Sequence, residues 1–128
     1  MDKWRRKGLG FVSDTVEVLQ AARALIADER NWCRLASYRR KGRHVQRCAM
    51  GAVNFAMGLD EHDVSGKSND CFSALCEVVH QGVRRFNDHH SHSDVLAMFD
   101  RAIAAEQAKA PVDAPLFVPA EWAERVAA

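Results

Sequence analysis

The spacing of apolar residues is the feature that most restricts how this chain can fold. Val18, Leu19, Ala22, Leu25 and Ile26 recur at intervals of three or four residues, and a similar period returns in several later stretches. Residues at this spacing form the apolar face of an amphipathic helix, whereas a half-buried strand would alternate at every second position. The sequence therefore predicts an all-α fold, a compact bundle of five or six helices with a proline-rich C-terminal extension.

Residues that start or stop helices set the expected boundaries. The predicted helices cover residues 14–28, 32–39, 44–58, 68–86 and a stretch capped by Ser91 or Ser93 and ending near 109, with a surface loop at 60–67. Asn31 is the expected cap of the second helix. Pro111, Pro115 and Pro119 interrupt the helical pattern, so residues 110–118 are expected to be extended ahead of a short last helix.

The length of 128 residues suits one hydrophobic core. We expect a helical core domain at residues 1–109, which includes a basic N-terminal arm, and a proline-rich tail at residues 110–128. The tail carries Leu116, Phe117 and Trp122, more apolar surface than a free extension needs. These residues are the candidate partner-binding residues, and they are expected to dock on the same chain, on a second copy or on another protein.

No apolar run follows the basic first residues, and no stretch approaches the roughly 20 apolar residues of a membrane span. The sequence therefore predicts a soluble, cytoplasmic protein without a membrane partner. Reduced thiols are expected at all four cysteines, because disulfides are rare in that compartment.

Charge is unevenly distributed along the chain. Residues 1–47 hold 12 Lys and Arg against 5 Asp and Glu, and residues 48–128 hold 6 against 12. The densest basic cluster comprises Arg39, Arg40, Lys41, Arg43 and Arg47. Several cations in one segment can neutralise phosphates, so the cluster is a candidate nucleic-acid site. The alternative is a solvated turn that pairs with the acidic loop at residues 60–63.

Cysteine and histidine allow a catalytic interpretation. Cys76 and His80 stand four residues apart on a predicted helix, and a neighbouring imidazolium would lower the pKa of the thiol. Cys33 is the other candidate nucleophile. The alternative is that these thiols pack as small apolar groups. His89, His90 and His92 with Asp94 have the His-x-His-x-Asp spacing of metal ligands but fall in a predicted surface turn. We therefore predict no catalytic residue, no metal site and no cofactor.

Three short segments carry a family resemblance. They are Trp32-Cys33, then Cys48-Ala49 with Gly51-Ala52, then Asn87-Asp88 ahead of Val95-Leu96. In this order they resemble an uncharacterised family of small proteins from actinobacterial and phage-type genomes. The chain departs from that pattern with Asn31 where the family has Gly and with Phe86 where it has Trp. The resemblance implies a shared helical core and a bacterial or phage setting, and no activity.

These observations favour a small, non-catalytic interaction or regulatory protein of the accessory type found in phages and mobile elements. It would act through protein contacts, with a protein partner or with a second copy. A nucleic-acid-binding helical module is the first alternative, and a cysteine- and histidine-dependent enzyme is the second.

Overall fold

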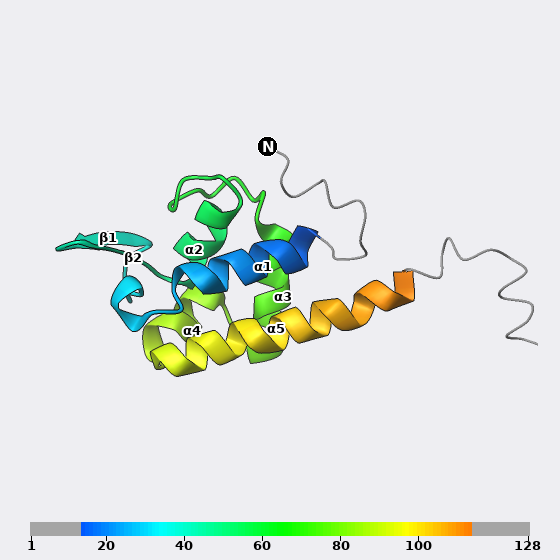
Figure 1. The fold of residues 1–128 in the computed structure, drawn as a ribbon. Coiled ribbons are helices and arrows are strands. Elements are labelled where there is room, and N and C mark those ends of the chain that lie inside the picture. The colour runs from blue at the N-terminus through cyan, green and yellow to red at the C-terminus, as the bar shows by residue number, and fades with distance from the viewer. Residues whose placement is uncertain (1–13, 114–128) are drawn as a thin grey trace, which may run out of the picture.

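A computed structural model describes residues 14–113 of the chain, and side chains as far as residue 109 (Figure 1). The elements in chain order are α1 (Asp14–Leu25), a 3-10 helix η3 (Glu29–Asn31), β1 (Tyr38–Lys41), β2 (His44–Arg47), α2 (Ala49–Ala56), α3 (Asn69–Val79), α4 (Val83–His89) and α5 (His92–Asp113). None of these helices has the length and apolar character needed to cross a bilayer.

The helices surround one hydrophobic core. α1 packs against α2 and α5, and α3 packs against α5. In Figure 1, α1 and α5 lie side by side and run in opposite directions, and the two strands project from the body beside the end of α1. The largest fully buried apolar side chains are Phe99, Leu19, Ile26, Leu75 and Met98. The apolar period that predicted the first helix does supply its buried face.

The all-α prediction is wrong, because residues 38–47 form an antiparallel β-hairpin. Lys41 pairs with His44 across a two-residue turn, and Gly42 in that turn has a φ of 61°. Short turns with positive φ match the twist of paired strands, and glycine adopts that conformation without strain. All four side chains of β1 are exposed. The strand therefore has no buried face, and no alternation of apolar residues reveals it.

The hairpin also displaces two predicted helices. Residues 32–39 are not helical; instead η3 precedes Trp32, and its cap is Asp28, whose side chain accepts a hydrogen bond from the Arg30 backbone N–H. The helix expected at 44–58 begins only at Ala49, since the preceding residues pair in β2. The Cys48 thiol caps it at 3.4 Å from the Gly51 nitrogen.

The helix expected at 68–86 is divided into α3 and α4. His80 takes the left-handed conformation that ends α3, with a φ of 56°, and Gly82 is the N-cap of α4. The predicted cap of the last helix is confirmed, because the Ser91 hydroxyl accepts a hydrogen bond from the Asp94 N–H at 3.1 Å. That helix continues through Pro111 to Asp113, past its expected end. Pro111 has no backbone N–H, so the helix lacks one backbone hydrogen bond in its last turn.

The expectations for the tail fall outside the described residues. They include the partner-binding residues Leu116, Phe117 and Trp122 and the last short helix. The basic arm before Asp14 also lies outside them.

Gly51 on α2 lies at a close contact with a neighbouring segment. A β-carbon at this position would be 2.1 Å from the Ser37 carbonyl oxygen. The neighbour is the loop before β1, which the sequence analysis had placed in the predicted helix at residues 32–39. Phe55, further along α2, is 46% exposed.

Gly51→Ala should therefore destabilise the fold, because the added methyl group meets a backbone carbonyl that is held in place. We expect a loss of about 1–3 kcal/mol in the free energy of unfolding, measured by urea denaturation. Gly82→Ala is the control, since its φ is −64° and no atom lies within 4 Å of the added carbon. Equal stabilities for the two variants would contradict the steric argument.

Candidate binding surface

The side chain of Asn87 on α4 is fully buried and joins three separate segments. Its oxygen accepts hydrogen bonds from the Trp32 indole nitrogen at 2.7 Å and from the Ala49 backbone nitrogen at 3.0 Å. Its amide nitrogen donates to the Cys33 carbonyl at 3.1 Å and to the Asp88 carboxylate at 3.2 Å. Residues from all three resemblance segments thus meet at one amide.

This amide fixes the start of a loop at residues 33–37. The Leu35 N–H donates to the Asp88 carboxylate at 2.8 Å, and the Cys33 thiol donates to the Ala36 carbonyl at 3.3 Å. At the other end of the loop, the Ser37 carbonyl group lies directly against Gly51. The loop is therefore held at its beginning, its middle and its end.

Leu35 is the unusual residue of this loop. Its φ is 63° and its side chain is 78% exposed. The left-handed conformation costs an L-residue about 1–2 kcal/mol, and an exposed leucine regains nothing through burial. Strained residues that the surrounding structure holds in place are concentrated at functional sites. No motif in the sequence marks this residue, because a single leucine at this position belongs to no periodic pattern.

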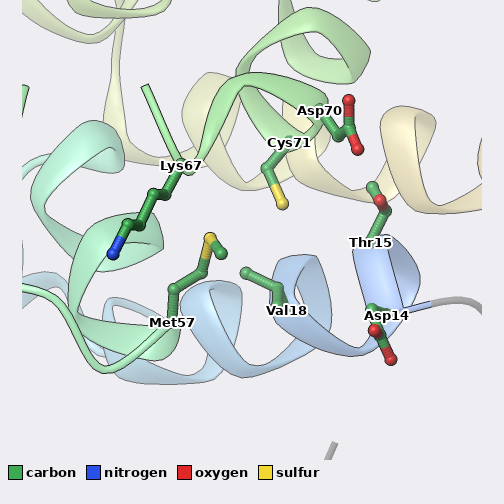
Figure 2. Close-up of a pocket in the computed structure, with 7 residues that line it drawn as sticks. All are labelled: Asp14, Thr15, Val18, Met57, Lys67, Asp70 and Cys71. Carbon is green, nitrogen blue, oxygen red and sulfur yellow. The ribbon is translucent and has the colours of Figure 1, made fainter. Parts of the chain in front are cut away.

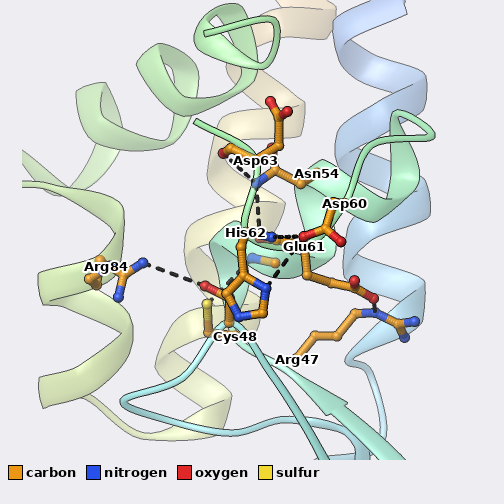
Figure 3. Close-up of polar contacts among 10 residues, drawn as sticks. Arg47, Cys48, Asn54, Asp60, Glu61, His62, Asp63 and Arg84 are labelled. Atoms are coloured by element: carbon orange, nitrogen blue, oxygen red, sulfur yellow. Dashed lines mark hydrogen bonds and ion pairs between the residues drawn. The ribbon is translucent and has the colours of Figure 1, made fainter. Parts of the chain in front are cut away.

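Arginines surround the loop. Arg34 donates to the His90 carbonyl at 2.6 Å, and its guanidinium lies 5.1 Å from the centre of the Trp32 ring. Arg84 reaches the Ser37 hydroxyl at 3.5 Å and is seen in Figure 3 extending from α4 toward the loop. Leu35 is thus an apolar side chain in a basic setting.

Arg47 does not belong with the other predicted phosphate-binding residues. Its guanidinium forms an ion pair with Glu61 at 2.9 Å, and both side chains are largely buried, with exposures of 13% and 14% (Figure 3). The same guanidinium lies 4.0 Å from the centre of the Phe55 ring and 6.0 Å from that of Tyr38. Arg47 therefore anchors the hairpin to the body.

The acidic loop at residues 60–63 is itself held from within. The buried amide of Asn54 donates to the carbonyls of Glu61 at 3.1 Å and Asp63 at 3.2 Å, and it accepts from the Ser68 hydroxyl at 2.7 Å (Figure 3). The expected pairing between the basic cluster and this loop is limited to Arg47 within the described residues. The role of Asn54 was not predicted, because a single polar residue on a predicted helix does not indicate which distant groups it will bond.

The other predicted cations are exposed on the hairpin. Arg39 donates to the Gln46 side chain at 3.2 Å. The side chains of Arg40, Lys41 and Arg43 form no hydrogen bond or ion pair with any residue that the structure describes.

Of the candidate nucleophiles, Cys33 is not activated. Burial raises the pKa of the Cys33 thiol to about 11, with a further contribution from nearby Cys48. Burial likewise raises the pKa of Cys71 to about 12. His80 is exposed at the end of α3, where its backbone N–H donates to the Cys76 carbonyl at 2.6 Å. A thiol needs its thiolate form to attack, so Cys33 is poorly suited to that role.

The histidines near α5 contact the backbone. The His90 ring bonds with the Phe86 carbonyl at 3.0 Å, and the His92 ring bonds with the Ile26 carbonyl at 2.7 Å. Within residues 14–113, no three side chains of the His, Cys, Asp and Glu types are grouped as metal ligands would be.

A cavity of about 190 Å³ lies between α1, the end of α2 and the start of α3 (Figure 2). Its lining residues are Asp14, Thr15, Val18, Met57, Lys67, Asp70 and Cys71. Sites for small molecules usually measure about 300–1,000 Å³. This cavity is smaller than that, so the surface around Leu35 is the stronger candidate site.

Residues 12–105 match the family of unknown function DUF6197. The chain belongs to this family. The match covers α1 through most of α5, so the Asn87 contacts and the Leu35 loop all lie within the DUF6197 region. The comparisons with curated proteins and with solved structures gave no match.

Asn87→Ala should destabilise this DUF6197 domain strongly, because the Trp32 indole, the Ala49 N–H and the Cys33 carbonyl would all lose a buried partner. Each unsatisfied buried group costs about 1–3 kcal/mol, so we expect a total loss of about 3 kcal/mol or more. Urea denaturation followed by tryptophan fluorescence measures it. Asn69→Ala, at an exposed position of α3, should change little. A small effect at both positions would contradict the central role of Asn87.

The raised thiol pKa values predict a dependence of stability on pH. The unfolded chain releases the Cys33 and Cys71 protons near pH 9, whereas the folded chain keeps them to about 11 and about 12. This contribution to the free energy of unfolding is complete below pH 9 and declines as the pH rises above it. Denaturation of Cys33→Ala/Cys71→Ala at the same pH values should show a shallower decline. Identical slopes would disprove the assignment.

Proposed function

We propose that the protein is a non-catalytic interaction module that binds a partner protein through the loop at residues 33–37. The observation that carries this proposal is Leu35, which is exposed and held in a strained conformation by a hydrogen bond to Asp88. Because the backbone at Leu35 is held in place by hydrogen bonds, the loop loses little further freedom on binding, which favours affinity. Its natural counterpart is an apolar pocket on another protein.

The surroundings of Leu35 indicate the charge of that partner. Arg34 and Arg84 border the loop, and Arg85 is exposed on α4. Opposite charges across an interface raise the association rate and reject wrong partners. An apolar pocket with an acidic rim is therefore the surface that fits.

This proposal is preferred to an enzyme because the geometry at Leu35 favours contact with another molecule, and because burial raises the pKa of the Cys33 and Cys71 thiols, which therefore stay protonated at neutral pH. More specifically, we propose a regulatory role of the accessory type carried by phages and mobile elements. The identity of the captured partner tests this regulatory role.

Leu35→Gly separates binding from stability. Glycine adopts positive φ freely, so this variant should unfold with a free energy equal to that of the wild type or up to about 1 kcal/mol higher. It should nevertheless lose the partner. The full-length chain is used to capture partners from its host, each partner is purified, and calorimetry measures its affinity for both forms. We expect the affinity to fall about tenfold or more, since about 1.4 kcal/mol of apolar contact corresponds to a factor of ten.

Val64→Gly is the matched control, because Val64 is another exposed apolar residue, at 93%, and lies in the acidic loop region. This variant should bind as the wild type does. Equal binding by Leu35→Gly and the wild type would refute the proposed surface.

A further inference from the structure

The hairpin tip has an excess of cations that the rest of the fold does not neutralise. Six cations elsewhere in the described region are engaged by ion pairs or by carbonyl groups: Arg23 with Asp100, Arg30 with Asp28, Arg47 with Glu61, Lys109 with Glu106, Arg34 with His90 and Arg101 with Val78. Residues 38–47 contain no Asp or Glu. The side chains of Arg40, Lys41 and Arg43 have no hydrogen-bond or ion-pair partner among the described residues, and they lie together at the tip of the hairpin. Their charge is therefore available for an external ligand.

The register places these cations on both faces of the ribbon. Arg40 pairs with Val45, and Lys41 pairs with His44. Because neighbouring positions of a strand point to opposite faces, Arg40 lies on one face, whereas Arg39 and Lys41 lie on the other. Arg43 stands in the turn between the strands. A flat acidic protein surface would meet one of these faces, whereas a groove between two anionic walls would meet both.

The size of the ribbon also fits such a groove. Each strand has four residues, which span about 13 Å, and the hairpin projects from the helical body in Figure 1. The major groove of B-form DNA is about 12 Å wide and admits a two-stranded ribbon, and it is about 8.5 Å deep, so strands of this length reach its floor. The phosphates of the two DNA strands form the walls of that groove. The major groove of duplex RNA is deep and narrow and excludes a ribbon.

The anchoring of the hairpin also favours its insertion into a groove. Arg47 ties the base of β2 to Glu61 and to the Phe55 ring, and the Gln46 side chain donates to the Arg30 carbonyl at 3.1 Å. The base is thereby fixed, whereas the cations at the tip are exposed. A projecting element with a rigid base loses less conformational entropy when it binds.

We propose that the hairpin inserts into the major groove of duplex DNA, with Arg40 on the phosphates of one strand and Arg39 and Lys41 on those of the other. Arg43 at the turn faces the floor of the groove. Contacts of this kind with phosphates give affinity without sequence preference. The site goes beyond the proposed function, because it uses the hairpin tip and does not involve Leu35.

The test is fluorescence anisotropy of the full-length chain with a duplex DNA of about 20 bp, between about 50 and 200 mM KCl. Three phosphate contacts, from Arg39, Arg40 and Lys41, predict that the logarithm of the binding constant falls against the logarithm of salt with a slope of about −2.7. Arg40→Gln/Arg43→Gln removes one of these contacts together with the cation at the floor of the groove and should reduce this slope to about −1.8. Lys67→Gln/Lys109→Gln removes the same charge from exposed positions elsewhere and should leave the slope unchanged. Melting temperatures of both variants should equal that of the wild type.

Two further ligands separate the alternatives. Duplex RNA of the same length should bind more weakly than DNA, and polyglutamate should bind more weakly than either. Absence of DNA binding at the lowest salt, or a slope that the hairpin variant leaves unchanged, would overturn the proposal. Polyglutamate binding as tight as DNA would assign the tip to an acidic protein. Leu35→Gly should bind DNA as the wild type does, so this site and the protein-binding loop can fail independently.

Discussion

The buried amide of Asn87 is the interaction on which the rest of the structure depends. A buried polar side chain is costly unless its hydrogen bonds are satisfied, and here the partners come from η3's end, from the first residue of α2 and from the neighbouring Asp88. The amide therefore sets the distance between α4, α2 and the chain that leads into the hairpin. Asp88 extends this control to Leu35. Apolar packing alone would not fix the loop, because apolar contacts have no preferred direction.

Features governed by local periodicity could be predicted from the sequence, whereas those governed by distant partners could not. α1 follows from the spacing of Leu19 and Ala22, and the Ser91 cap follows from its own turn. The hairpin was missed because β1 buries no side chain. In the candidate site, the exposed cations of residues 39–43 were found from composition, but Leu35 gave no signal. Its conformation depends on a carboxylate 53 residues further along the chain.

Arg47 shows why a charge cluster in a sequence is an incomplete guide to a binding site. It differs from Arg40 in the residues that fold beside it, Glu61 and Phe55. A buried ion pair must recover the cost of desolvation through good geometry and further contacts, and here two aromatic rings flank the guanidinium. The same residue type thus serves as an anchor at the base of the hairpin and as a free charge at its tip.

The hydrogen bonds that shape the loop also set when it can form during folding. The hairpin closes over a two-residue turn, and such local structures form within microseconds. The Trp32–Asn87 and Leu35–Asp88 bonds join residues separated by 55 and 53 positions. They can form only after α4, which holds Asn87 and Asp88, has been synthesised. During synthesis, the residues of the hairpin are therefore complete and able to pair before the Leu35 loop can be fixed. A nascent or truncated chain that lacks α4 carries the cations of residues 39–43, but its Leu35 loop is not held by the bond to Asp88.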